Sequence, residues 1–195
     1  MWKRLGDLAQ VTTGYPFREK VLAEDEGDLA VLQIKDLGID GHLDLAGALR
    51  IRGEAAHERH RLQANDILLQ SRGVTNRAVV FEGTVRAIAA LGLLVVRPLP
   101  EVIKPAFLYW FLNHPKTQSR LQDLSRGSTV SFIAKTDVED FPIPTPPIEL
   151  QEQVISVDRI RRHEKRLTAD LDRLRGEYID NLMWHTAASE PTKRT

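Results

Sequence analysis

The sequence predicts an α+β protein in which a β-rich domain with short helices precedes one long C-terminal coiled-coil helix. Short apolar runs separated by glycines dominate the first half of the chain, four prolines fall within residues 141–147, and a heptad pattern follows them. We therefore expect a domain over residues 1–147, a helix over 148–184 and a flexible tail over 185–195.

The expected strands are apolar runs bounded by turn residues. They are Ala30–Ile34, Ile67–Gln70, Ala78–Phe81 and Leu93–Val96. Glycines lie between these runs, as is usual where a chain reverses direction. The spacing of the runs indicates strands joined by sizeable loops.

Two short helices are expected between the strands and the prolines. Pro105 suits a first helical position, an aromatic and aliphatic run continues to Leu112, and Pro115 ends it. A second helix is expected over Lys116–Leu124.

Beyond the prolines, apolar residues alternate at spacings of three and four, which is the seam of a coiled coil. A helix from Ile148 to about Leu182 would extend roughly 50 Å and would need a partner helix. The seam positions, interrupted by Glu164, are Val157, Ile160, Leu167, Leu171, Leu174 and Tyr178.

The composition is that of a folded protein without membrane spans or cysteine chemistry. Hydrophobic residues make up 42% and charged residues 28% of the chain, as in folded soluble proteins, and no apolar run approaches the roughly 20 residues that cross a bilayer. We expect a cytoplasmic location with no membrane association. The absence of cysteine excludes disulfides, thiolate metal sites and a cysteine nucleophile.

The formal net charge is zero, with 27 basic and 27 acidic residues, so the balance does not by itself favour nucleic-acid binding. Sequence-specific readers place their cations locally, however, because affinity depends on the phosphates actually neutralised. The distribution of basic residues is therefore more informative than their sum.

No enzymatic motif is supported. Thr145-Pro146-Pro147-Ile148 lacks both the leading amide or carboxylate and the aromatic residue of the adenine methyltransferase motif. Glycine-rich nucleotide motifs and a Walker lysine are missing. His57 and His60 have no third ligand at a suitable spacing, so we expect surface residues rather than a zinc site.

Three blocks of the sequence resemble the specificity subunits of Type I restriction-modification enzymes. Leu62–Gly73 reads Leu-Gln-Ala-Asn-Asp-Ile-Leu-Leu-Gln-Ser-Arg-Gly, similar to a family pattern of leucine, glycine-aspartate, apolar strand and arginine-glycine. In Gly127–Ile155, a Gly-Ser-Thr loop precedes the proline block and the start of the helix. Leu5–Gly14, followed by Tyr15-Pro16-Phe17, resembles the opening block. The full subunit has two recognition domains and two spacer helices, whereas this chain has room for one of each.

This resemblance implies a non-catalytic component of a phage-defence system that recognises a sequence in double-stranded DNA. It implies a homodimer that pairs through the helix and reads a bipartite inverted-repeat target. The implied partners are adenine methyltransferase (modification) subunits that use S-adenosylmethionine and a restriction subunit that translocates DNA with ATP and Mg. The chain itself is expected to hold no cofactor and no metal.

With the resemblance, the polar and basic loop residues of these blocks become candidates for DNA contact. From residue types alone, ordinary polar turns remain the alternative, Phe17 equally suits a core anchor, and the charged run 159–166 suits a solvated helix face. The candidate DNA-binding residues are Tyr15, Arg18, Arg72, Thr75, Asn76, Arg77, Arg126, Ser128, Thr129, Ser131 and Lys135.

Two rival functions fit the same sequence. One is the recognition subunit of another restriction-modification or phage-defence system, and the other is a coiled-coil adaptor whose globular domain binds protein. Steep salt dependence of DNA binding separates the DNA readers from the adaptor. The recognised base pairs depend on loop geometry that no motif encodes.

Overall fold

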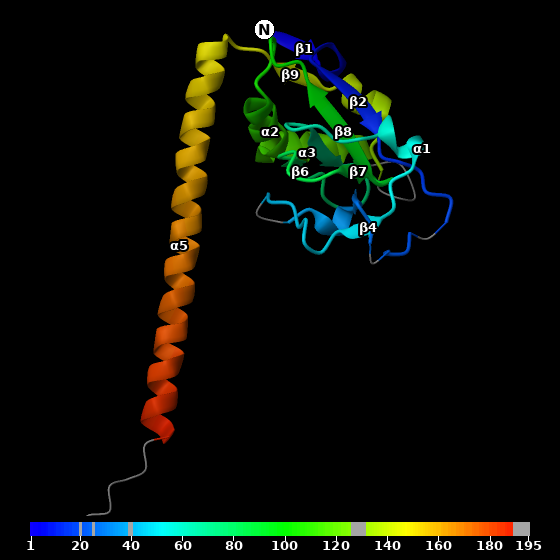
Figure 1. Ribbon diagram of the computed structural model, residues 1–195. Helices are drawn as coiled ribbons and strands as arrows, with labels where there is room; N and C mark the ends of the chain where they lie inside the picture. The colour runs from blue at the N-terminus through cyan, green and yellow to red at the C-terminus, as the bar shows by residue number, and fades with distance from the viewer. Residues whose placement is uncertain (20, 25, 39–40, 126–131, 189–195) are drawn as a thin grey trace, which may run out of the picture. The chain divides into compact units, whose positions relative to one another are not determined.

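The computed structural model describes residues 1–188 apart from 20, 25, 39–40 and 126–131. The chain divides into two compact units, Met1–Gln153 and Val154–Thr195. The first unit holds three small sheets and short helices, and the second is formed by the long helix α5 (Ile148–Ala188) beyond its first turns (Figure 1). The predicted α+β class with a long C-terminal helix is confirmed.

A four-stranded antiparallel sheet forms the centre of the first unit, in the order β2-β8-β5-β6. Its strands are β2 (Ala9–Thr13), β8 (Leu93–Pro98), β5 (Ile67–Gln70) and β6 (Ala78–Val80). β8 is central, since it pairs with β2 from Ala9↔Pro98 to Thr13↔Leu94 and with β5 from Ile67↔Val96 to Gln70↔Leu93. The predicted strands at residues 67, 78 and 93 begin where expected.

A second sheet has the order β4-β3-β7 and shares a core with the first. β3 (Leu29–Leu32) pairs antiparallel with β4 (Leu49–Ile51) and parallel with β7 (Ala87–Ala89). The core combines Leu32 of β3 with Leu68 of β5 and Val95 of β8. Burying each such side chain stabilises the fold by about 1.5–3 kcal/mol. β3 is fully buried, which explains its continuous apolar run.

Helices α2 (Pro105–Asn113) and α3 (Pro115–Ser125) cover the β6 side of the first sheet, close to their predicted bounds (Figure 1). Asn113 replaces a neighbouring strand at this edge, because its side chain accepts from the Ala78 amide at 3.1 Å and donates to the Ala78 carbonyl oxygen at 2.9 Å. The short segments η1 (Leu5–Asp7), η2 (Ile34–Asp36), α1 (Ala55–Glu58) and α4 (Lys135–Glu139) complete the unit.

The proline block contains a strand that the sequence did not predict. β9 (Pro142–Pro144) pairs antiparallel with β1 (Trp2–Arg4), and Ile143 at its centre is buried. Proline is tolerated here because both strands of a two-stranded sheet are edges. α5 begins at Ile148 as expected and continues through residues 185–188, which were expected in the tail. Among the described helices, none has the length and apolarity needed to span a membrane.

One buried ion pair fixes the turn before β5. Asp66 is completely buried, receives two hydrogen bonds of 2.7 Å from Arg97, and accepts the Gln63 amide at 2.7 Å. The Asp66 carboxylate raises the pKa of the Arg97 guanidinium above its usual value. The pair therefore ties this turn to the end of β8.

We expect Asp66→Ala to lower the free energy of unfolding by about 3 kcal/mol, because it leaves Arg97 and the Gln63 amide without their hydrogen-bond acceptor. Urea denaturation measures the change. Asp140→Ala is the control, since it removes an exposed ion pair with Arg4 and should cost less than about 1 kcal/mol. Equal effects of the two substitutions would contradict the role assigned to Asp66.

Candidate nucleic-acid interface

The C-terminal ends of β2 and β5 lie at the same end of the four-stranded sheet, where the strands lead into loops. Both strands run antiparallel to β8, so they run parallel to each other on its two sides. Neighbouring strands are about 4.8 Å apart, which places the two ends about 10 Å apart. The Gly14 amide donates to the Leu93 carbonyl oxygen at 2.9 Å. The Ser71 amide donates to Gly92 at the same distance. We call this end, formed by Thr13–Tyr15, Ser71–Arg72 and Ala90–Leu93, the loop edge.

Arg72 projects from the loop edge against Phe132. An isolated antiparallel bridge joins the two residues, and the Arg72 guanidinium carbon lies 5.6 Å from the centre of the Phe132 ring. The Ile133 amide also donates to the Ser71 carbonyl oxygen at 2.9 Å. Arg72 is exposed, and within the described residues no carboxylate pairs with it. Gly73 follows with φ of 99°, a conformation that favours glycine.

The rest of this loop is held by the side chain of Gln70. Its amide donates to the Arg72 carbonyl oxygen at 2.7 Å, and its side-chain oxygen accepts the Thr75 hydroxyl at 3.2 Å. Asn76 donates to the Gln70 carbonyl oxygen at 3.1 Å and is only 1% exposed. Arg77 donates to the carbonyl oxygen of Leu37 at 3.0 Å. Thr75, Asn76 and Arg77 therefore shape the loop, and the buried Asn76 side chain is not presented to a ligand.

Tyr15 is an anchor of the first loop. Its ring makes edge contacts with the rings of Phe17 and His57, each with centroids 4.8 Å apart, and with His60 at 5.1 Å. Phe17 is partly buried and packs against a second hydrophobic cluster, which includes Leu29 and Ile88, as the alternative for this residue predicted. Arg18 is exposed. Of the candidates in this loop, Arg18 is the one presented to solvent.

Part of the block Gly127–Ile155, with Arg126 before it, lies outside the described residues. Arg126, Ser128, Thr129 and Ser131 fall in the segment 126–131, of which the structure describes nothing. Phe132 directly follows this segment at the loop edge, and Lys135 begins α4, where it pairs with Glu139 at 3.4 Å. Through Phe132, the block Gly127–Ile155 thus meets the block Leu62–Gly73 at the loop edge.

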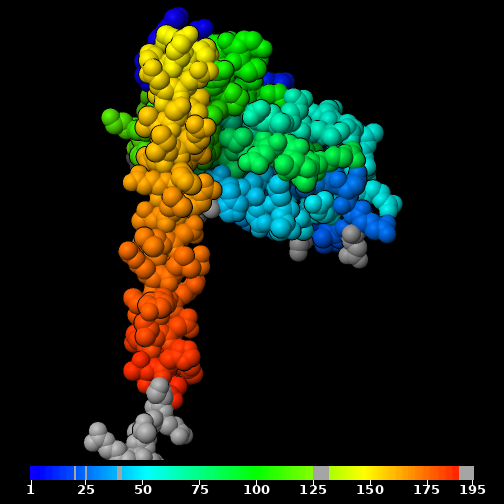
Figure 2. Space-filling model, turned by 60° about the vertical axis from the view of Figure 1, so that its left-hand side comes forward, coloured from blue at the N-terminus to red at the C-terminus, as the bar shows by residue number. Residues whose placement is uncertain are grey.

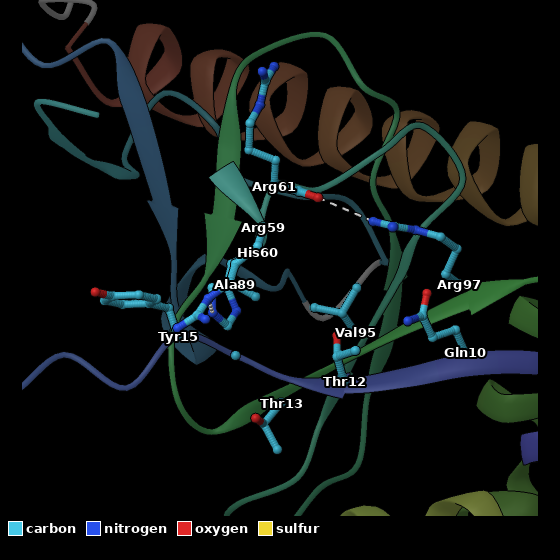
Figure 3. Close-up of a pocket in the computed structure, with 11 residues that line it drawn as sticks. Gln10, Thr12, Thr13, Tyr15, Arg59, His60, Arg61, Ala89, Val95 and Arg97 are labelled. Carbon is cyan, nitrogen blue, oxygen red and sulfur yellow. Dashed lines mark hydrogen bonds between the residues drawn. The ribbon is translucent and has the colours of Figure 1, made fainter. Parts of the chain in front are cut away.

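A pocket that the sequence did not predict opens beside the loop edge. Figure 3 shows Gln10 and Arg97 on one side, His60 and Tyr15 on the other, and Thr12 between them. Thr12 and Thr13 belong to β2, whereas the basic run Arg59–Arg61 comes from the segment after α1. The run His-Glu-Arg-His-Arg at residues 57–61 is the one signal of this pocket in the sequence. Nothing in the sequence indicated that this run lies opposite β2.

The two histidines are less exposed than expected. His57 is buried, and its ring nitrogen accepts the Glu54 amide at 3.1 Å, so the prediction of a surface position was wrong for it. Burial lowers the pKa of His60, and the positive charge of Arg59 and the neighbouring His57 lower it further. Among the described residues, no group of three or more histidine, aspartate or glutamate side chains could hold a metal ion.

The apolar seam of α5 is exposed along its length. Val157 is 67% exposed, Leu171 is 47% exposed, and the other predicted seam residues lie in the same range. Figure 2 shows the side chains that line the helix from yellow to red. The charged run forms ion pairs within the helix, such as Arg161 with Asp158 at 3.0 Å, as a solvated face would. The exposed seam is an unpartnered apolar face.

A family model described as Type I restriction modification DNA specificity domain matches residues 1–173. The chain belongs to this family. The match includes all three resembling blocks and most of the seam, and it confirms the prediction of a non-catalytic specificity component. The loop edge and the pocket are thus features of a Type I DNA specificity domain.

Two curated relatives are specificity subunits. The chain is 24% identical over 129 residues to the Type I restriction enzyme EcoBI specificity subunit of Escherichia coli, a match that covers 65% of this chain and 27% of the relative. It is 28% identical over 104 residues to the putative type I restriction enzyme MjaX specificity subunit of Methanocaldococcus jannaschii, covering 51% of this chain and 24% of the relative. The chain therefore corresponds to a minor part of each relative.

Solved structures share the fold. The HsdS subunit from Thermoanaerobacter tengcongensis matches with a TM-score of 0.62 and 20% identity, over 92% of this chain and 43% of that one. A chain from work on complex assembly and conformational transition of the type I restriction-modification system matches with a TM-score of 0.68 and 23% identity, over 94% of this chain and 42% of that one. This specificity domain therefore spans less than half of either solved chain.

We expect His60 to titrate below the pH range of a free histidine, and Arg59→Ala to raise its pKa because a repulsive cation is removed. NMR titration of the ring protons measures both values, with His60→Gln assigning the signal. Since the pKa is lower in the folded state, the unfolded chain takes up this proton first, and His60 costs stability as the pH falls through the range of a free histidine. An ordinary pKa in the unsubstituted protein would contradict this account.

Proposed function

We propose that this specificity domain recognises a sequence in double-stranded DNA through its loop edge, as part of a Type I restriction-modification enzyme. The observation that carries the proposal is the gathering at one sheet edge of the three blocks by which the chain resembles the family. Family membership supports the same conclusion.

The loop edge suits a duplex in size and chemistry. Its two strand ends lie about 10 Å apart, and the major groove of B-DNA is about 12 Å wide. Arg72 offers a guanidinium fork, the group that most often reads guanine, and its contact with Phe132 holds it without neutralising it. The bonds to Gln70 hold the loop in one conformation before DNA arrives.

We expect Arg72→Ala to weaken DNA binding several-fold, because it removes a cation of the loop edge, and the double variant Arg72→Ala, Arg126→Ala to weaken it more strongly, because it also removes a second basic candidate of the sequence. Each lost phosphate contact should reduce the slope of log affinity against log salt by about 0.9. Gel shifts with random duplex DNA over a salt series measure both quantities.

Arg4→Ala is the matched control, because Arg4 precedes the opposite end of β2 and pairs with Asp140 at 2.8 Å. It should change neither affinity nor slope. If the double variant keeps its fold, its affinity and its salt slope, the loop edge is not the DNA site. A wild-type chain that dimerises without binding DNA would favour the protein-binding adaptor.

We further propose that two copies associate through α5 and read two inverted half-sites separated by a fixed gap. The seam is exposed in the single chain, and closed two-fold pairs are the commonest oligomers. The midpoint of the seam from Val157 to Tyr178 lies beside Leu167, so an antiparallel pair would match Val157 of one copy with Tyr178 of the other. A rod of roughly 50 Å would then separate two DNA-reading units.

In this assembly the chemistry belongs to partner subunits. Modification subunits would methylate adenine with S-adenosylmethionine, and a restriction subunit would use ATP and Mg to translocate and cleave DNA. The specificity domain contributes recognition of the DNA sequence and holds none of these cofactors.

Replacing Leu167, Leu171 and Leu174 by asparagine should convert the dimer to a monomer and abolish bipartite recognition, because the apolar seam is lost while the globular unit is untouched. Light scattering measures the mass, and methylation-site sequencing in cells with the whole system measures the target. Lys165→Ala with Asp172→Ala, both one residue beyond seam positions, is the control and should remain dimeric. A monomeric unsubstituted chain at micromolar concentration with modification subunits present, or a single contiguous asymmetric target, would exclude this dimer.

A further inference from the structure

The pocket between β2 and the segment after α1 contains a cation whose charge is not neutralised within the described residues. Arg59 donates from Nε to His60 Nε2 at 3.2 Å, and within the described part of the chain no carboxylate pairs with it. The pocket lining has no acidic residue. Arg59 therefore keeps its two terminal guanidinium nitrogens for a ligand.

Nearby carboxylates are already occupied by other arginines. Glu58 accepts hydrogen bonds from Arg61 at 3.2 Å and from Arg86 at 2.7 Å. Asp66 is buried and bound to Arg97 through both of its oxygens. Neither acid is left to neutralise Arg59. The local charge at the pocket is positive although the chain as a whole is neutral.

Opposite the arginine, β2 supplies neutral hydrogen-bond donors. Thr12 is exposed and lies on the same face of β2 as Gln10, so its hydroxyl group and the Gln10 side-chain amide both line the pocket, whereas the Thr13 side chain leaves the opposite face of the strand (Figure 3). One guanidinium with hydroxyl and amide donors is the combination that proteins use for phosphate oxygens. Of the three arginines in the lining, Arg61 and Arg97 are paired with carboxylates, and the Tyr15 and His60 rings pack against each other with their centroids 5.1 Å apart.

We propose that this pocket binds a backbone phosphate of duplex DNA, with Arg59 as the cation and the Thr12 hydroxyl and the Gln10 amide as donors. The inference rests on the proposed DNA recognition and deepens it. Thr13 and Tyr15 belong both to the pocket and to the loop edge, so a duplex engaged by Arg72 would pass the pocket. The pocket would then fix the register of the DNA, and the loop edge would read the bases.

The test uses the full chain and fluorescent random-sequence duplex DNA over a potassium chloride series. Arg59→Ala should lower affinity about tenfold, equally for all sequences, and reduce the slope of log affinity against log salt by about 0.9, because one phosphate contact is lost. Thr12→Val should lower affinity about threefold and leave the slope unchanged, because it removes a neutral donor. Arg4→Ala should change neither quantity.

The outcomes separate the two proposals. If the unsubstituted chain binds DNA with a steep salt slope and both Arg59→Ala and Thr12→Val bind identically to it, the phosphate pocket is excluded and the loop edge stands. If the unsubstituted chain fails to bind DNA, the proposed function and this inference both fail. If Arg59→Ala loses only binding of inorganic phosphate, measured by phosphorus NMR, the pocket serves a free anion and the inference is overturned. Thr12→Val keeps the test decisive even if Arg59→Ala does not fold.

Discussion

The pairing of β8 with both β2 and β5 is the constraint on which the arrangement of the specificity domain depends. A strand that is antiparallel to both neighbours forces those neighbours to end at the same edge. Segments far apart in sequence, after Thr13 and after Gln70, are thereby brought within about 10 Å of each other. No loop contact is needed to achieve this, because the backbone ladder of three strands sets the distance. The loops can therefore vary in sequence while the strand ends from which they start stay in place.

Around this frame, polar side chains divide into those that hold the backbone and those that face solvent. The side-chain NH₂ groups of Gln70, Asn76 and Gln118 donate to backbone carbonyl oxygens, that of Gln118 to Asn76 at 2.7 Å. Arg72 and Arg59 carry charges that no described carboxylate neutralises. Hydrogen bonds that hold the backbone of a loop reduce the conformational entropy that the loop loses on binding. The exposed charges of that loop then contribute more to binding affinity.

Local sequence patterns predicted the elements that depend on local residues. The apolar runs at Ile67 and Leu93, the proline at the start of α2 and the heptads of α5 all signal structure within a short window. β1 and β9 escaped prediction because their pairing joins residues at opposite ends of the first unit. The pocket escaped for the same reason, since β2 meets Arg59 only in the folded chain. Asn65, where the family pattern has glycine, adopts φ of 73°, which asparagine tolerates better than most residues.

The closure of β1 on β9 sets an order of events during synthesis. The Met1 carbonyl oxygen accepts both the amide of Thr145, at 2.8 Å, and its hydroxyl, at 3.0 Å. A ribosome must release the chain beyond Thr145 before this small sheet can form, and α5 is the next segment to emerge. Long-range closure of this kind is slow compared with helix formation. The globular unit would thus mature while its helix is being made, and the apolar seam would be complete only after the segment that closes the first unit has been synthesised.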